Sequence, residues 1–254
     1  MSTTFVRDTG TVFYREFTPV MRRPLGLLFS MAQPLLFLFL FGPLLGGTAA
    51  IGGETGAPWQ WFVPGILIMM CLSGPMMAGY SLLIDLGGGS MERILVTPMN
   101  RTAMLVGRTL KEFVILLAQA ALIIGLAVPL GFRIHPLGVL AGLALLLVLG
   151  LGLSSLSFIL AIVSYPGGNL FYAVTQMVMF PLLLLSGVLL PVEAGPAWLQ
   201  GLALVNPVGY IVEAARALFD GRFADPAVLY GWAAACAIAA VGLVLGTRAM
   251  RRGI

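Results

Sequence analysis

Long runs of apolar residues, separated by short polar stretches, organise the sequence from residue 25 to residue 246. The runs are continuous rather than alternating, which indicates helices and excludes the two-residue period of a transmembrane barrel. Most approach or exceed the roughly 20 residues with which a helix crosses the hydrocarbon core of a bilayer. The pattern predicts six membrane-spanning helices, over residues 25–46, 61–84, 101–131, 137–163, 170–190 and 227–246.

The first 24 residues have a shorter and more mixed pattern. On a helix, apolar side chains such as Phe5, Val12 and Phe17 share one face, while Arg15 and Glu16 point elsewhere. This arrangement predicts an elbow helix over residues 1–24, lying in the inner membrane interface and leading into the first span. A solvated leader is the alternative. Because no internal repeat or linker is visible, the whole sequence predicts one all-α membrane domain, residues 1–254.

Composition and charge refine this view. The chain is 59% hydrophobic and 9% charged, whereas about a quarter of the residues in a soluble domain are charged. If the N-terminus is cytoplasmic, eleven of the 14 Lys and Arg residues fall on the cytoplasmic side, which predicts that both termini are cytoplasmic. The four tryptophans then fall at the outer interface, where indole rings prefer to lie. The basic excess is thus explained by topology, and we expect no nucleic-acid partner.

Few polar residues lie inside the predicted spans, and no acid or base lies near their centres. Proton relays are marked by such intramembrane charges, so proton-coupled transport is disfavoured. Gln33, Gln119 and Gln176 are candidates to line a substrate path, although glutamines equally serve as hydrogen-bonding contacts between helices. The single histidine, His135, has no partners that would complete a metal site, so we expect none.

A charged segment between the second and third spans stands out, over residues 85–108. Glu92, Arg93, Arg101 and Arg108 crowd into it, in a chain with so few charges. A helix from Arg101 to the end of the third span would be about 46 Å long, longer than a hydrocarbon core of about 30 Å. Its first turns therefore protrude into the cytoplasm. From the residues alone, the segment is either a solvated loop or a docking surface.

The string E-R-I-L-V-T-P-M-N-R-T-A-M-L-V-G-R, residues 92–108, closely resembles the segment that follows the second span in ABC-2 type permeases. The likeness is greatest to the daunorubicin-resistance branch of these exporter subunits. In that family the segment forms a coupling helix that docks on an ATPase subunit. The resemblance implies coupling roles for the matching positions, which are Glu92, Arg93, Thr97, Pro98, Arg101, Gly107 and Arg108.

A second resemblance to the same family follows the fifth predicted span. The stretch from Ser186 to Gly221 combines Leu-Pro, Trp-Leu and Asn-Pro steps with an Arg before a Gly. The resemblance implies short helices within residues 191–226 that re-enter the outer leaflet and close the path. The matching outer-gate positions are Pro191, Trp198, Asn206, Pro207 and Arg216. Independently, Glu213 and Asp220 lie three and four residues from Arg216, close enough to pair with it on a helix.

Together these likenesses imply the permease subunit of an ATP-binding-cassette exporter in a bacterial plasma membrane, active in multidrug export and antibiotic resistance. We expect a homodimer with two ATPase subunits, moving a hydrophobic or amphipathic drug-like substrate outward. The chain contains no G-x-x-x-x-G-K-[ST] phosphate-binding loop, so it is not expected to be an enzyme, and ATP and Mg would bind the partner ATPase. The alternatives are a permease for a lipid-linked glycan or glycolipid, and a non-transporting membrane scaffold.

Overall fold

The computed structural model describes residues 2–22, 24–41, 58–88, 101–189, 191–192 and 195–253. Within these ranges all the regular secondary structure is helical, which confirms the predicted all-α class. The helices are α1 (Ser2–Arg22), α2 (Pro24–Leu36), η1 (Phe37–Phe41), α4 (Pro58–Gly87), α6 (Arg101–Ala127), η2 (Val128–Leu130), α7 (Pro136–Ser164), α8 (Gly168–Leu184), α9 (Ala197–Val205), α10 (Pro207–Phe219) and α11 (Pro226–Gly253).

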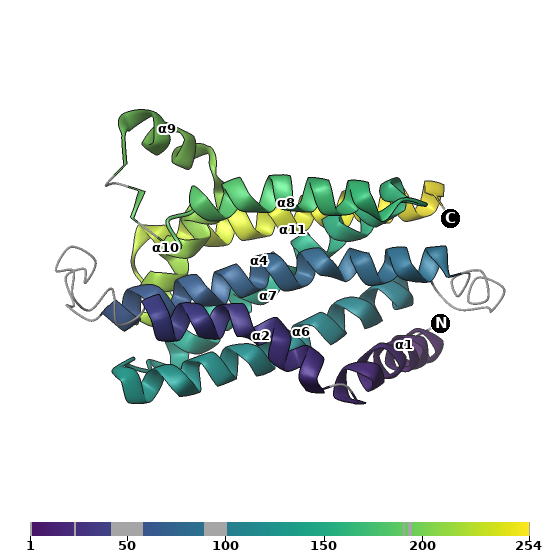
Figure 1. Ribbon diagram of the computed structural model, residues 1–254, viewed down its shortest axis with the longest axis horizontal. Helices are drawn as coiled ribbons and strands as arrows, with labels where there is room; N and C mark the ends of the chain where they lie inside the picture. Colours follow the sequence, from purple (N-terminus) through teal and green to yellow (C-terminus); the bar gives the residue numbers. More distant parts are fainter. Residues whose placement is uncertain are drawn as a thin grey trace.

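The long helices form one elongated bundle. Helices α4, α6, α7 and α11 run along its length, and both chain ends lie at the same end of it (Figure 1). Helix α7 packs on α4 and α11, and α8 packs on α4 and α7. The short helices α9 and α10 lie at the opposite end, where α10 packs on α4, α7 and α11.

Four of the helices are long and apolar enough to cross a membrane, over Pro58–Gly87, Ala103–Leu130, Pro136–Ser164 and Pro226–Gly246. They match four of the six predicted spans closely. The bent pair of α9 and α10 raises the number to five if it is counted as one span, and Gly168–Leu184 and Leu28–Leu40 are shorter apolar helices. The first predicted span is described only as far as Phe41, and residues 42–46 lie outside the described ranges.

Helix α8 ends earlier than the fifth predicted span. Its last residue is Leu184 rather than residue 190, and the chain then turns through Gly187, whose φ of 71° suits a glycine. Its 17 residues are close to the shortest stretch, about 17 residues, that spans a bilayer. The apolar run in the sequence therefore covers both a helix and the buried turn that follows it.

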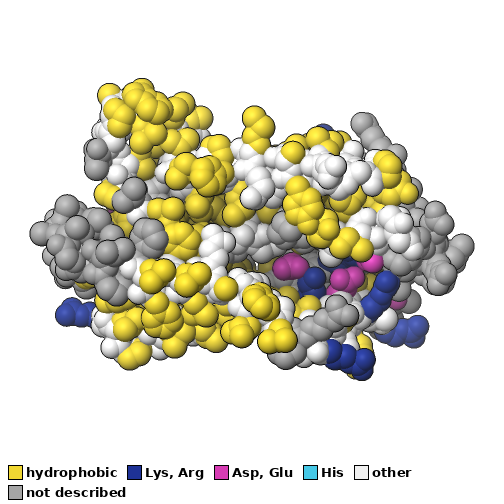
Figure 2. Space-filling model, viewed as in Figure 1, with side chains coloured by type: hydrophobic (Ala, Val, Ile, Leu, Met, Phe, Trp, Pro, Cys, Tyr) yellow, Lys and Arg dark blue, Asp and Glu magenta, His cyan; other side chains and the backbone are white. Residues whose placement is uncertain are grey.

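Helix α4 is the centre of the bundle. The most apolar stretch of α4 is 76% buried, against 28% for α6 and 22% for α11. The outward faces of α6 and α11 carry apolar side chains such as Leu122 and Val241, which are about half exposed. Hydrophobic side chains cover much of the surface in Figure 2. Apolar surface on this scale is expected of a protein that lipid surrounds.

Small residues let the helices approach closely. A Cβ atom on Gly242 of α11 would lie 2.5 Å from the carbonyl oxygen of Gly152 in α7, and one on Gly152 would lie 2.8 Å from the backbone nitrogen of Ala239. On α4, the backbone nitrogen of Gly79 donates to Ser157 Oγ of α7 at 2.9 Å. Close backbone contact of this kind is typical of helices that associate in membranes.

Helix α1 confirms the predicted N-terminal helix and adds a contact that the pattern did not indicate. A Cβ atom on Gly107 of α6 would lie 2.9 Å from the carbonyl oxygen of Thr9 and from the Val12 side chain. Val12 is buried in a cluster with residues of α4, α6, α7 and α8. The part of the apolar face of α1 around Val12 is therefore covered by the bundle itself.

Candidate functional site

Two groups of buried charge lie at opposite ends of the bundle. The first, called here the α1–α4–α6 network, consists of Glu16, Asp85, Arg108, Lys111 and Glu112. The second, called the α10 arginine site, is Arg216 with the groups that hold it. Because buried charges are costly unless they are paired, both groups indicate positions where the fold is built around a specific arrangement.

The α1–α4–α6 network joins three helices. Arg108 Nη2 of α6 lies 3.3 Å from Glu16 Oε1 of α1 and also contacts Asp85 Oδ2 at the end of α4. Lys111 Nζ lies 2.9 Å from Glu112 Oε1 and 3.9 Å from Glu16 Oε2. The Arg108 and Lys111 side chains are only 3% and 9% exposed, so solvent screens these pairs weakly.

This network includes both ends of the charged segment, Asp85 and Arg108. Asp85 comes shortly before residues 89–100 in the chain and Arg108 shortly after them. The pair between them, together with the close packing of Gly107 on α1, fixes the two helices that bracket the segment. A displacement of the segment would therefore act on α4, α6 and α1 together.

The predicted coupling residues fall into two sets. Glu92, Arg93, Thr97 and Pro98 lie outside the described residues, and Arg101 is described only as the first residue of α6. Gly107 and Arg108 are described, and both face α1 and are buried. Glu16 is predicted to point away from the apolar face of α1, but it faces α6 and pairs with Arg108 and Lys111. Asp85 is not a predicted site residue, although an acid beside a long apolar stretch is a usable signal for a paired charge.

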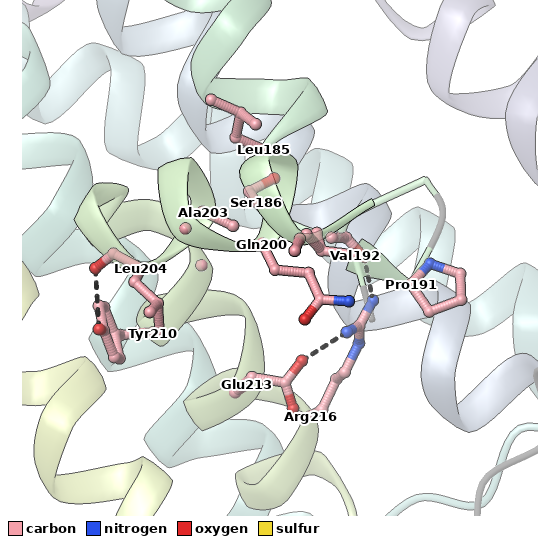
Figure 3. A pocket seen from close by; sticks show the side chains of 14 residues that line it. Leu185, Ser186, Pro191, Val192, Gln200, Ala203, Leu204, Tyr210, Glu213 and Arg216 are labelled. Atoms are coloured by element: carbon pink, nitrogen blue, oxygen red, sulfur yellow. Dashed lines mark hydrogen bonds and ion pairs between the residues drawn. The ribbon is translucent and has the colours of Figure 1, made fainter. Parts of the chain in front are cut away.

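The α10 arginine site ties α10 to α4 and to the turn after α8. Arg216 Nε donates to the Trp61 carbonyl oxygen at 3.1 Å and Nη2 to the Gly187 carbonyl oxygen at 2.8 Å. Nη1 donates to Glu213 Oε1 at 2.7 Å, which confirms the predicted i,i+3 pair (Figure 3). The guanidinium carbon also lies 3.9 Å from the centre of the Trp61 ring. All three of these nitrogens thus have acceptors and the cation rests on an aromatic face.

A sharp bend separates α9 from α10. The two helices meet at 85°, with Asn206 between them and Pro207 at the first position of α10. Asn206 Oδ1 accepts a hydrogen bond from the Val208 backbone nitrogen at 3.0 Å and caps the helix, while Nδ2 donates to the Leu182 carbonyl oxygen of α8 at 2.8 Å. Asparagine at the cap and proline just after it are both favoured at helix starts.

A cavity of about 510 Å³ opens between the end of α8, α9 and α10. Its lining is mainly apolar, with polar groups from Ser186, Gln200, Tyr210, Glu213 and Arg216 (Figure 3). Cavities of this size and character accept small organic molecules. Of the predicted outer-gate residues, Pro191 and Arg216 line it and Asn206 sets the bend beside it. Trp198 is not among its lining residues and is 67% exposed on α9.

The three candidate path glutamines lie on three different helices. Gln119 Nε2 of α6 donates to Ser30 Oγ of α2 at 3.0 Å, which is a contact between helices. Gln33 on α2 and Gln176 on α8 are exposed on the surface of the single chain.

His135 is also exposed, and its Nδ1 lies 3.0 Å from the Phe219 carbonyl oxygen. Within the described ranges no group of three or more His, Cys, Asp or Glu residues is placed to hold a metal ion.

Comparison with known proteins places these features in a family. The model of the ABC-2 type transporter family matches residues 7–219. A protein of Cyanophora paradoxa named as a transport permease, ycf38, is 30% identical over 219 residues, which cover 85% of this chain and 75% of its own length. The daunorubicin resistance ABC transporter permease protein DrrB1 of Streptomyces coeruleorubidus is 28% identical, over 86% of this chain and 77% of its own length. A protein of Mycobacterium tuberculosis named as the doxorubicin resistance permease DrrC is 24% identical, over 96% of this chain and 89% of its own length.

Proposed function

Because the chain belongs to the ABC-2 type transporter family, we propose that it is the permease subunit of an ATP-driven exporter in a bacterial plasma membrane. In this proposal two copies of the chain associate with two ATPase subunits, and each copy crosses the membrane six times with both termini in the cytoplasm. The four long apolar helices, the shorter α2 and α8, and the two chain ends at one end of the bundle all support this topology.

The observation that carries the proposal is the α1–α4–α6 network. A permease that is driven by a separate ATPase needs a mechanical connection between the docking segment and its spans. Asp85 and Arg108 bracket residues 89–100 and are joined by a buried ion pair, and Glu16 adds α1 to the same unit. We expect Glu92, Arg93, Thr97, Pro98 and Arg101 to contact the ATPase. Gly107 and Arg108, which pack against α1, should transmit the displacement of this segment to the bundle.

The opposite end of the bundle supplies the outer gate of the proposed mechanism. Arg216 fixes α10 to the first turns of α4 and to the turn after α8, while α9 leaves α10 at 85°. When α4 moves relative to α8, these contacts have to shift together. The cavity between α8, α9 and α10 is then the last compartment that a substrate meets before release.

The names of the relatives favour a drug-like cargo. Two of them are described as permeases for daunorubicin or doxorubicin resistance. The mainly apolar cavity with a few polar groups fits a hydrophobic or amphipathic molecule. We therefore propose such a molecule as the substrate, ahead of a lipid-linked glycan or glycolipid.

The test is reconstitution of the purified permease with its ATPase in proteoliposomes. ATP is added on the side of the ATPase, and transport of an amphipathic fluorescent drug is compared with transport of a fluorescent glycolipid. ATP-dependent movement of the drug supports the proposal, and movement of the glycolipid alone replaces the proposed cargo. Failure of the chain to co-purify with any ATPase, with the bundle intact, contradicts the exporter function and favours a scaffold.

A further inference from the structure

The two sides of α1 differ in charge once the helix is packed. Glu16 faces the bundle, where it pairs with Arg108 and Lys111, and its side chain is only 13% exposed. Arg7, Arg15 and Arg22 are all exposed. At 3.6 residues per turn these three arginines fall within roughly 80° of arc on the helix surface. Asp8 lies about 20° from Arg15 around the helix, so the cationic part of this outer face is the second half of α1, where Glu16 is turned toward the bundle.

The cations converge in the second half of α1. Arg15 and Arg22 line one groove on the helix surface with Tyr14, Thr18 and Pro19. Two turns separate the two arginines, a rise of about 10.5 Å. The one acid of this half of the helix, Glu16, lies about 100° from Arg15 and about 120° from Arg22 around the helix, and it pairs with Arg108. Lys and Arg side chains gather at the end of the bundle where α1 lies (Figure 2).

The lipid-facing surface begins directly after this groove. Leu25, Leu28 and Phe29 of α2 are 67%, 60% and 77% exposed. Exposed apolar side chains in such a run need lipid to cover them. Arg22 lies one turn before them along the chain, so the groove lies at the level where the hydrocarbon core ends and phosphate headgroups begin. Arginine is the side chain best suited to bind phosphate at that depth, because its planar fork forms paired hydrogen bonds.

We propose that Arg15 and Arg22 form a binding site for the headgroup phosphate of an anionic phospholipid. The bound lipid holds the outer face of α1 in the same way that Glu16 holds the inner face to α6. Each arginine near an anionic surface contributes about fivefold in affinity, so the pair contributes about 25-fold. The site belongs to the permease alone, and its occupancy does not depend on an ATPase or on the cargo.

Native mass spectrometry of the purified full chain tests this site directly. The chain is released from nanodiscs that contain equal amounts of phosphatidylglycerol and phosphatidylcholine, and the retained lipids are counted. We expect a strong preference for phosphatidylglycerol and a loss of most of this preference in Arg15→Gln/Arg22→Gln. Arg15→Lys/Arg22→Lys, which keeps both charges but not the planar fork, should show an intermediate preference. Arg222→Gln is the matched control, because this arginine is exposed at the opposite end of the bundle, and it should leave the preference unchanged.

Three outcomes overturn the proposal. An unchanged preference in Arg15→Gln/Arg22→Gln means that anionic lipid binds elsewhere. Displacement of phosphatidylglycerol by millimolar inorganic phosphate means that the groove is a site for free anions. If the glutamine variant keeps the lipid preference but fails to co-purify with the ATPase, the cationic face is instead a protein interface. Co-elution of the glutamine and wild-type chains on gel filtration confirms that the variant is folded.

Discussion

Arg108 of α6 and Glu16 of α1 form a buried ion pair, with Nη2 and Oε1 3.3 Å apart, and Arg108 also contacts Asp85 of α4. One guanidinium thus joins three helices. The energetic consequence follows from its burial: a buried ion pair adds little net stability, but removing one partner leaves the other charge uncompensated. This asymmetry makes Arg108 a sensitive position for measurement.

Arg108→Met should destabilise the chain. The substitution keeps an apolar side chain of similar length but removes the ion pairs that Arg108 forms with Asp85 and Glu16. Glu16 then keeps only its longer pair with Lys111, at 3.9 Å. Removing one partner of a buried pair costs about 3–5 kcal/mol. The measurement is the free energy of unfolding in detergent. Arg222→Met serves as the control, because Arg222 is 56% exposed and its ion pairs should contribute about 1 kcal/mol or less. Equal losses in the two variants would contradict the importance of the network.

Gly107→Ala and Gly10→Ala should change stability in opposite directions. A Cβ atom at Gly107 would lie 2.9 Å from the Thr9 carbonyl oxygen, whereas one at Gly10 meets nothing within 4 Å. In a helix, alanine is more favourable than glycine by about 1 kcal/mol, and Gly10→Ala should gain this stability in full. At Gly107 the overlap, worth about 1–3 kcal/mol, should exceed that gain and push α1 from α6. Thermal unfolding of both variants tests this. A stabilised Gly107→Ala variant would show that α1 is not tightly packed.

Glu92→Ala combined with Arg101→Ala should uncouple the transporter. Both positions belong to the string that resembles the ATPase-docking segment, so we expect drug transport to fall at least tenfold while membrane insertion and expression are unchanged. ATP hydrolysis by the associated ATPase should persist, without its stimulation by substrate. Transport and hydrolysis are measured on the same proteoliposomes. Undiminished transport in the double variant would remove this segment from the coupling mechanism.

Arg216→Lys should impair transport even though the charge is kept. A lysine ammonium lacks the planar fork that reaches the Trp61 and Gly187 carbonyl oxygens at once, and it loses the stacking on the indole ring. We expect about a tenfold loss of transport rate, corresponding to about 1.4 kcal/mol. Arg222 is exposed in the same segment of the chain, and Arg222→Lys, as the control, should change the transport rate less than twofold. If both lysine variants transport at the wild-type rate, the α10 arginine site is not part of the gate.

Asn206→Ala and Asn206→Ser should separate the two roles of this side chain. Alanine removes both the helix cap at Val208 and the hydrogen bond to the Leu182 carbonyl oxygen, and each loss costs about 1 kcal/mol. Serine retains a capping oxygen and loses only the second contact, so it should cost about half as much. Unfolding free energies of the two variants provide the comparison. A serine variant as unstable as alanine would mean that capping contributes nothing here.

The sequence pattern identified the long helices because hydrophobicity over 20 or more residues is a strong signal. The spacing of Val208, Ile211 and Phe219 also suits one face of a helix, and all three are buried on α10. The polar side of α10 was less predictable. The spacing predicts that Arg216 can pair with Glu213 and Asp220, but it does not indicate that Arg216 is only 6% exposed, because its partners Trp61 and Gly187 come from distant parts of the chain.

Contacts between remote segments account for the other differences. The pairing of Glu16 with Arg108 depends on how α1 turns back onto α6, which no local spacing records. The apolar run after residue 170 continues beyond the end of α8 because the turn at Gly187 is itself buried, so hydropathy alone did not mark the helix end. Cys236 likewise occurs in an apolar run but is exposed on α11, because a lipid environment and a protein interior favour the same residue types.

The docking of α1 on α6 also constrains the order of biogenesis. Translation delivers α1 first, but its contact partners Gly107, Arg108 and Lys111 emerge from the ribosome only after two apolar segments have entered the translocon. Until then Glu16 has no counter-ion from α6, and Val12 lacks the part of its cover that Met104 and Gly107 of α6 provide. The docking of α1 on the bundle therefore comes late in biogenesis, because it requires the insertion of α6. A nascent chain stalled before residue 107 should leave α1 open to protease, and one extended well past residue 111 should protect it.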